Sequence, residues 1–200
     1  MGRPREFDTQ KALETAMSVF WDQGYEDASI SELLTSMRIT KGSFYKAFSD
    51  KHSLYLAALD LYAKNVIAPT AQTLSDPAGG PGQERILNLF RHVADAAANT
   101  GDRQGCFLCN AAVDRAAQDK DVEGRLSAMF ARLENGIAAA LRDMGTAEEE
   151  QMLRATARSL VALYLGFRVL GRAGRSTDYA DDIITQVERI LFMPPVAEPI

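Results

Sequence analysis

Apolar residues recur with the 3.6-residue period of an α-helix along almost the whole of this 200-residue chain, and no stretch alternates as a half-buried strand would. The clearest example runs from Thr9 to Gln23, between Asp8, which is suited to capping a helix, and Gly24, which is suited to ending one. One face of that stretch is apolar and carries Leu13, Ala16, Met17, Phe20 and Trp21. The pattern predicts an all-α fold of about nine helices.

Three more helices are expected before residue 75. A Ser-x-x-Glu capping signature at Ser29 begins a short helix that ends near Met37. Thr40 caps a third helix to about residue 48, and a fourth follows Ser49 or Asp50 and continues towards residue 74. The stretch SDPAGGPGQ, residues 75–83, predicts a linker. Five further helical patterns follow, at about 84–99, 106–118, 122–144, 148–170 and 178–192, before a tail that contains three prolines.

Composition narrows the functional classes. No apolar run approaches the roughly 18 residues of a membrane span, and MGRPREFD lacks the apolar segment of a signal peptide, so we expect a cytoplasmic protein. Cys106 and Cys109 give no disulfide framework, and His52 and His92 lack neighbours in metal-ligand spacing. No Ser/His/Asp set, metal cluster or phosphate loop is apparent, so neither an enzyme nor a cofactor or metal is expected.

The net charge of −5 would argue against a nucleic-acid partner if the charge were evenly spread. Residues 1–64, however, carry eight Lys or Arg against nine Asp or Glu, so most of the negative excess lies in the remainder. The acidic residues of this part fall mostly on the first expected helix and just after it, away from Arg38, Lys41, Lys46 and Lys51. Such segregation is typical of a small docking surface for an anion.

Two short helices joined by three or four residues describe a helix-turn-helix, although an ordinary helical hairpin has the same outline. In TKGSFYKAF, residues 40–48, Phe44 and Phe48 share one face and can pack inward. The other face is too polar for a core and carries Lys41, Gly42, Ser43, Tyr45 and Lys46. A glycine inside a helix costs about 1 kcal/mol, which suggests close approach of another backbone. Lys51 opens the next helix, whose N-terminus can also hold a phosphate. Double-stranded DNA is the partner that these features favour together.

These same residues resemble the TetR family of bacterial transcriptional regulators. The resemblance rests on Phe20, on GY at 24–25, on SISELL at 29–34, on ITKGSFYKAF at 39–48 and on Lys51. It implies a DNA-binding domain at 1–49, a regulatory and dimerisation domain at 50–193 and a flexible tail at 194–200. It also implies a homodimeric repressor that a small molecule releases from a palindromic operator. The DNA contacts that it implies are Arg3, Arg5, Ser29, Thr40, Lys41, Gly42, Ser43, Tyr45, Lys46 and Lys51.

Two features of the DNA-binding part leave alternatives open. Arg38 stands in the turn where the family usually has glycine, and it is either a tolerated substitution or an added phosphate contact. We favour the first. The arm GRPRE, with Arg3 and Arg5, is either simply disordered or able to enter a minor groove.

The regulatory half should enclose an apolar pocket with a few polar groups for an unidentified effector. Aromatic stripes on helices usually pack as core, so each candidate has that plainer interpretation as well; Asn110 and Arg168 need polar partners if buried. The candidate ligand-binding residues are Phe90, Val93, Cys106, Phe107, Cys109, Asn110, Phe130, Leu133, Tyr164, Phe167 and Arg168.

Cys106 and Cys109 admit three interpretations. They are inert core thiols, which we favour; a redox couple, for which the expected βαβ pattern is missing; or a sensor. The sensor interpretation comes from resemblance, since GC-x-x-x-N occurs in a subgroup of TetR regulators, some of which respond to electrophiles. It requires Cys106 to be partly exposed near a helix N-terminus.

The last two helices are apolar over a wide arc and contain Gly166 and Gly171, which permit close approach. By resemblance they form the homodimer interface. Two rival functions remain: a thiol oxidoreductase built on the CxxC sequence, and a helical scaffolding module that has lost DNA binding, for which only Arg38 argues.

Overall fold

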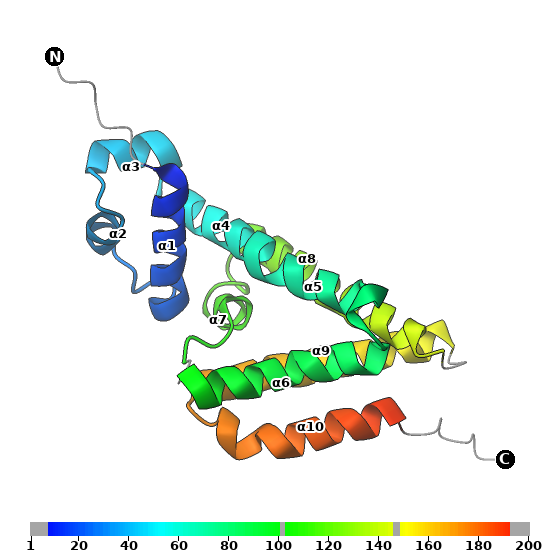
Figure 1. Ribbon diagram of the computed structural model, residues 1–200. Coiled ribbons are helices and arrows are strands. Elements are labelled where there is room, and N and C mark those ends of the chain that lie inside the picture. Colours follow the sequence, from blue (N-terminus) through cyan, green and yellow to red (C-terminus); the bar gives the residue numbers. More distant parts are fainter. Residues whose placement is uncertain (1–7, 101–102, 146–148, 193–200) are drawn as a thin grey trace. The chain divides into compact units, whose positions relative to one another are not determined.

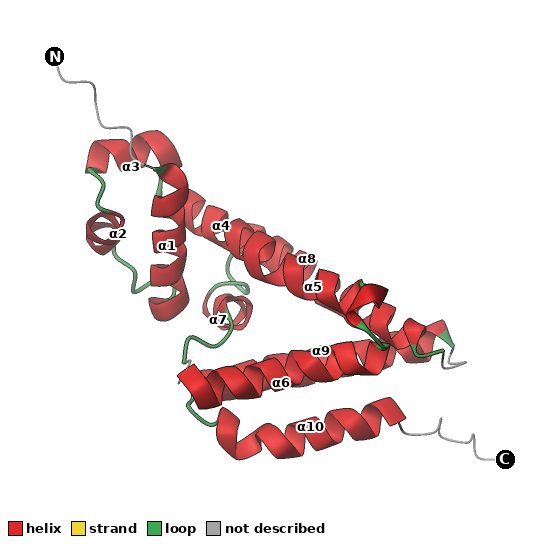
Figure 2. Cartoon of the chain, in the orientation of Figure 1, coloured by secondary structure: helices red, strands yellow, loops and turns green. Residues whose placement is uncertain are grey.

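The computed structural model describes residues 8–100, 103–145 and 149–192, and these residues contain helices and loops but no strand (Figure 2). The prediction of an all-α fold is confirmed. The helices of the described residues are α1 (Thr9–Gln23), α2 (Ile30–Met37), α3 (Lys41–Phe48), α4 (Lys51–Tyr62), the π-helical turn η1 (Ala63–Ile67), α5 (Ala68–Ser75), the 3-10 turn η2 (Pro77–Gly79), α6 (Gly82–Thr100), α7 (Phe107–Asp114), α8 (Lys120–Asp143), α9 (Glu150–Arg172) and α10 (Ser176–Phe192) (Figure 1).

The chain packs as two compact units. The first unit comprises the described residues of 1–66 together with 107–127, and the second comprises those of 67–106 and 128–200. This division by packing includes α4, α7 and the start of α8 in the first unit. The predicted division by function, after residue 49, is a different statement and stays a prediction, and the tail at 194–200 lies outside the described residues.

An aromatic cluster forms the core of the first unit, where α1 packs against α2, α4 and α7. Tyr55 of α4 meets Phe20 of α1 edge-on at 5.0 Å between ring centroids, and it meets Phe107 of α7 at 5.9 Å. Phe107 also packs edge-on against Tyr62 at 5.6 Å. Each such ring stabilises the fold by about 1.5–3 kcal/mol through burial alone, so α7 is an integral part of this core.

The long helix expected up to residue 74 is divided. A π-helical turn, Ala63–Ile67, separates α4 from α5, and Pro69 lies in the first turn of α5. Proline has no N–H to donate to the carbonyl four residues earlier, so an uninterrupted ladder of hydrogen bonds is impossible at this point. The division explains why the described residues form ten α-helices where the sequence predicts about nine.

The helix expected at 106–118 is shorter than its apolar pattern. It ends at Asp114, and turns follow until α8 begins at Lys120. Asp119 ends the turn because its carboxylate accepts hydrogen bonds from the N–H groups of Asp121 and Val122 at 3.1 and 3.2 Å. An aspartate in this position caps a helix and satisfies N–H groups that have no partner within it.

The second unit is a helical bundle in which α6 packs against α5, α9 and α10. Phe90 and Phe167 are fully buried in it. Gly136 permits close contact between α8 and α5, since a Cβ there would lie 3.0 Å from the carbonyl oxygen of Ala71. Among the described helices none combines the length and the apolar character of a membrane span.

Candidate nucleic-acid interface

The turn between α2 and α3 is built around a left-handed residue. Arg38 has φ 55° and ψ 42°, and its N–H donates to the carbonyl of Thr35 at 3.2 Å. The N–H of Ile39 reaches back to the carbonyl of Leu34 at the same distance. These bonds end α2 and direct the chain into α3. They also hold Arg38 in the left-handed conformation, which costs about 1 kcal/mol or more for a residue with a Cβ atom.

The two faces of α3 differ as the sequence predicts. Phe44 and Phe48 are buried and 6.0 Å apart between ring centroids. On the other face Tyr45 is 47% exposed, although it is a large aromatic residue. The remaining predicted contacts, Thr40, Lys41, Gly42 and Lys46, are exposed, and Ser43 is half-buried. The helix therefore presents two ammonium groups, a phenol and hydroxyls on one surface.

Gly42 lies open on this surface. A Cβ there would meet only the hydroxyl of Thr40, at 4.0 Å. The close approach that the sequence suggested is therefore not made by any described part of the chain itself.

The hydroxyl groups of this region also act as helix caps. Ser29 Oγ accepts the N–H of Glu32 at 3.1 Å, and Thr40 Oγ1 accepts that of Ser43 at 3.2 Å. Capping uses the oxygen as an acceptor, so the hydroxyl hydrogen can still donate to a phosphate. Thr40 and Ser43 also lie 3.0 Å apart through their hydroxyls, and one of the two donates to the other. These side chains are thus held in place before any partner arrives.

Lys51 is the first residue of α4 and is half-buried. Its Nζ donates to the carbonyl of Glu26 at 3.3 Å and lies 4.5 Å from the centroid of the Tyr25 ring. The N-terminus of α4 is capped by Asp50, which accepts the N–H of Ser53 at 2.7 Å. That bond lowers the pKa of Asp50 and uses one of the N–H groups that the sequence assigned to a phosphate. The phosphate contact expected of Lys51 stays a prediction. Arg3 and Arg5 lie outside the described residues.

In the first unit, two of the predicted ligand residues of α7 contact neighbouring helices, and their role in binding an effector stays a prediction. Phe107 is part of the aromatic core, and Asn110 Nδ2 donates to the carbonyl of Trp21 at 3.1 Å. The polar partner that a buried asparagine requires is therefore a backbone carbonyl of α1. Cys109 is half-buried.

In the second unit, the predicted ligand residues pack closely. Phe90, Val93, Leu133 and Phe167 are buried, and Phe130 is half-buried. Tyr164 meets Phe90 edge-on at 6.0 Å between ring centroids. Their role in binding an effector stays a prediction.

The described part of the second unit contains a small hollow and an open groove. The one lined by Val93, Gly105 and Arg168 holds about 10 Å³, room for roughly one water molecule. Arg168 donates to the carbonyl of Gly105 there. The other is an open groove of about 660 Å³ between α5 and α8, lined mainly by small residues such as Ala71 and Gly136. None of the predicted ligand residues lines that groove.

The structure does not show the partial exposure of Cys106 that the sensor interpretation requires. Cys106 immediately precedes α7, as expected, but it is only 2% exposed. Neither cysteine forms a disulfide bond. A buried cysteine commonly behaves as a small hydrophobic residue, so the burial of Cys106 favours the interpretation as core packing.

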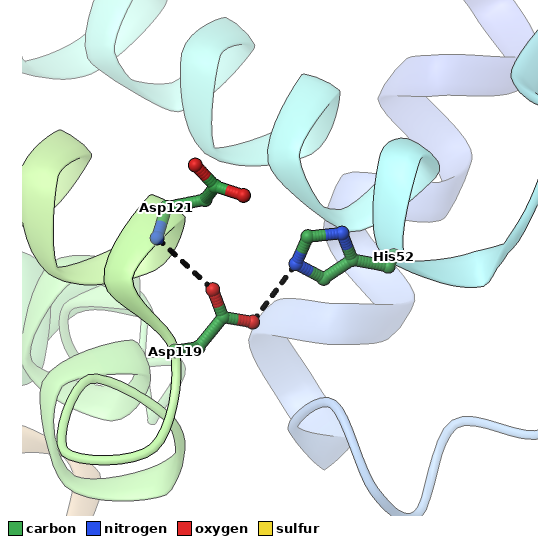
Figure 3. Close-up of side chains that lie close together, drawn as sticks. All are labelled: His52, Asp119 and Asp121. Carbon is green, nitrogen blue, oxygen red and sulfur yellow. Dashed lines mark hydrogen bonds and ion pairs between the residues drawn. The ribbon is translucent and has the colours of Figure 1, made fainter.

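The sequence missed a cluster of three possible metal ligands in the first unit. His52, Asp119 and Asp121 lie close together (Figure 3), and one possible ligand atom from each lies within 4.8 Å of those of the other two. His52 Nε2 lies 2.8 Å from Asp119 Oδ2, but the Asp119 carboxylate also caps α8 and lies 3.4 Å from Arg115 Nε. Burial raises the pKa of Asp119, but the hydrogen bonds from Val122 and His52 outweigh it and hold that pKa below its ordinary value. A guanidinium already balances this carboxylate, so ion pairing and capping account for the cluster without a metal.

Two models of known families match the chain. Residues 12–58 match the model described as bacterial regulatory proteins, tetR family. Residues 83–186 match the model described as transcriptional regulator LmrA/YxaF-like, C-terminal domain. The first match covers α2, α3 and most of α1 and α4, where the exposed polar face described above is found.

Individual proteins are similar along most of their length. An uncharacterised HTH-type transcriptional regulator, YezE of Bacillus subtilis, is 27% identical over 186 residues, which cover 91% of this chain and 95% of that protein. The HTH-type transcriptional repressor NemR of Escherichia coli is 25% identical over 205 aligned positions, which cover 98% of this chain and 100% of the repressor. Among solved structures, a cysteine-substituted form of the TetR family regulator CifR, in complex with a 26-bp operator DNA, matches with a TM-score of 0.78 and 26% identity over 97% of this chain and 100% of CifR.

Proposed function

The chain belongs to the tetR family of bacterial regulatory proteins and is a DNA-binding transcriptional regulator, and from this premise we propose that it is a homodimeric repressor which a small molecule releases from a palindromic operator. The DNA-binding domain is residues 1–49, and the regulatory and dimerisation domain is residues 50–193. Repressors and an operator complex among its relatives support this assignment.

The single observation that carries the proposal is the exposed polar face of α3. Lys41 and Lys46 supply charge for phosphates, while Ser43 and Tyr45 supply groups that can reach base edges. Gly42 leaves room for a close backbone approach that no described part of the chain fills. A face of this composition is suited to contact with both phosphates and base edges.

An exposed row of small and apolar residues on α9 supports a homodimer. Met152, Ala155, Ala162, Gly166 and Val169 recur at helical spacing and are all exposed in the single chain. A Cβ on Gly166 would meet no described atom within 4 Å. Small residues on a helix allow a second helix to approach closely. A dimer also presents two copies of α3 to two half-sites.

The effector would act by favouring a dimer whose two copies of α3 no longer match the half-site spacing. We place the effector's pocket in the regulatory domain among the apolar residues predicted above. The alternatives that sequence leaves, a thiol-sensing regulator or a thiol oxidoreductase, lose support because Cys106 is buried. The proposed regulator has no enzymatic activity. It acts in the cytoplasm, where the DNA lies.

The experiment is a salt titration of operator affinity. Operator sequences are first selected from random duplexes, and binding is then measured by fluorescence anisotropy at several salt concentrations. Changing Lys46 to Gln removes one phosphate contact per subunit, so the slope of log K against log salt should fall by about 0.9 per contact.

Lys64→Gln is the matched control, because Lys64 is an exposed lysine of η1 outside the proposed DNA surface. Its slope should equal that of the parent protein. If both variants keep the parent slope, α3 is not the DNA-contacting helix.

A further inference from the structure

Two cations from different elements lie over the ring of Tyr25. Lys51 Nζ of α4 is 4.5 Å from the ring centroid, and the guanidinium carbon of Arg115, just after α7, is also at 4.5 Å. Burial raises the pKa of the Tyr25 phenol above its ordinary value of 10.0, so the ring is uncharged at neutral pH. An uncharged aromatic face attracts cations. One side chain therefore connects the proposed phosphate anchor, Lys51, to the segment that follows α7.

The turn that carries Tyr25 is held from this same segment. The N–H of Tyr25 donates to Asp114 Oδ2 at 2.7 Å. Gly24 has φ 86°, and a Cβ there would lie 3.1 Å from the same carboxylate oxygen, so the contact is close as well as polar. Arg115 Nη1 lies 2.7 Å from Glu26 Oε1. Each of three successive residues of the turn thus meets Asp114 or Arg115.

Lys51 is fixed by this turn and by its own helix. Its Nζ donates to the carbonyl of Glu26 at 3.3 Å. The next residue of α4, His52, lies 2.8 Å from Asp119 Oδ2, and Arg115 Nε lies 3.4 Å from that oxygen. The position of the Lys51 ammonium group therefore depends on contacts made by Asp114, Arg115 and Asp119, which lie more than 60 residues away in sequence.

We propose that Asp114, Arg115 and Asp119, here named the latch, position Lys51 for its phosphate contact and so connect α7 to the DNA surface. This inference rests on the proposed function. The helix that ends at the latch carries three predicted ligand residues, Phe107, Cys109 and Asn110. A ligand that displaces α7 moves the latch, and Lys51 then no longer has the geometry that its phosphate contact needs. Arg115 is a positioning residue: it acts through Tyr25 and Glu26.

The test is a double-mutant cycle on operator binding. Arg115→Gln should weaken binding about 10-fold and reduce the slope of log K against log salt by nearly as much as Lys51→Ala does, about 0.9 for each phosphate that is no longer neutralised. The double variant should bind no more weakly than Lys51→Ala alone, since Arg115 acts through Lys51. Arg115→Lys, which keeps a cation near the ring, should restore part of the slope.

Arg125→Gln is the matched control. Arg125 also belongs to the first unit, and its Nε lies 3.0 Å from Asp60 Oδ1 of α4. This ion pair is distant in sequence from the turn at 24–26, so its loss should leave Lys51 in place. Its salt slope should equal that of the parent. Thermal unfolding of each variant shows whether it is folded. If Arg115→Gln does not fold, Glu26→Gln takes its place, because that side chain is 66% exposed and its substitution removes only the partner of Arg115.

The outcomes separate the two proposals. A parent protein that selects no operator sequence overturns the proposed function, and the latch with it. A parent that binds its operator while Arg115→Gln, or Glu26→Gln in its place, keeps the parent slope overturns the latch alone. If the losses of binding free energy in the two single variants simply add in the double variant, the latch is also overturned, because Arg115 and Lys51 then act independently.

Discussion

At the scale of single residues, the backbone of Arg38 is strained: like Ser49, it has a positive φ without being a glycine. Glycine reaches its left-handed conformation without steric cost, whereas arginine does not. Arg38→Gly should therefore raise the free energy of unfolding by about 0.5–1 kcal/mol, part of the gain being offset by the greater freedom of glycine in the unfolded chain. Chemical denaturation measures the change.

Ser36→Gly is the control for this substitution, because Ser36 is an exposed residue inside α2. It should lower the free energy of unfolding by about 0.5–1 kcal/mol. Operator affinity then distinguishes the two interpretations of Arg38. An unchanged salt slope in Arg38→Gly fits a tolerated substitution, and a smaller slope fits a phosphate contact. A less stable Arg38→Gly would contradict the account of strain.

Asp119 gives a prediction about pH. Its folded pKa is lower than the ordinary value of 3.8, so the carboxylate contributes stability that is complete above that value and is lost as the pH falls through the folded pKa. Asp119→Asn keeps a capping oxygen for α8 but removes the charge beside His52 and Arg115. The variant should be less stable than the parent at neutral pH, and the difference should shrink below about pH 3.8.

Urea denaturation at neutral pH and at a series of acid pH values measures this difference. A gap between parent and variant that stays constant down to the lowest pH would show that the charge of Asp119 is not what stabilises the contact. The sequence could not predict this site, because its partner His52 is 67 residues distant and only the folding of α7 and α8 against α4 brings them together.

At the scale of helices, local signals were reliable where a cap was present. Asp8, Ser29 and Thr40 cap the helices that the sequence assigned to them, and Asp50 caps the fourth, for which the sequence left Ser49 and Asp50 open. The apolar pattern did not predict helix ends that are set by backbone hydrogen bonding or by tertiary contacts. The apolar period runs through η1 without a visible break, and the pattern beyond Asp114 continues although Asp119 begins a new helix there.

The exposed row on α9 gives a prediction about assembly. Leu163 and Leu170 of α9 are half-buried in the single chain, so a charge at either position would also disturb their own unit. Ala162→Glu and Val169→Glu place a charge on exposed positions instead, and should give folded monomers because a dimer interface does not tolerate an unpaired buried charge.

Light scattering and sedimentation velocity measure the mass of these variants. Ala98→Glu, on an exposed position of α6, is the control and should keep the mass of the parent. A parent that is already monomeric at micromolar concentration, or α9 variants that stay dimeric, would show that this face is not the interface.

At the scale of the whole molecule, the sequence could predict the fold class and the outward face of α3, because both follow from periodicity and capping within short segments. It could not predict that α7 joins the first unit, since that depends on Phe107 meeting Tyr55 and Tyr62 across the chain. For the same reason it could not identify the polar partner of Asn110, which is the carbonyl of Trp21; the role of Asn110 in binding an effector stays a prediction.

The most direct test of the central claim is selection of random double-stranded DNA by the purified parent protein, followed by sequencing of the retained fragments. The account predicts one enriched motif with two inverted half-sites about one helical turn or a multiple apart, and disappearance of that motif's preference in Tyr45→Ala. Retained DNA with no common motif, or a Tyr45→Ala variant that selects the same motif with the same affinity, would contradict it.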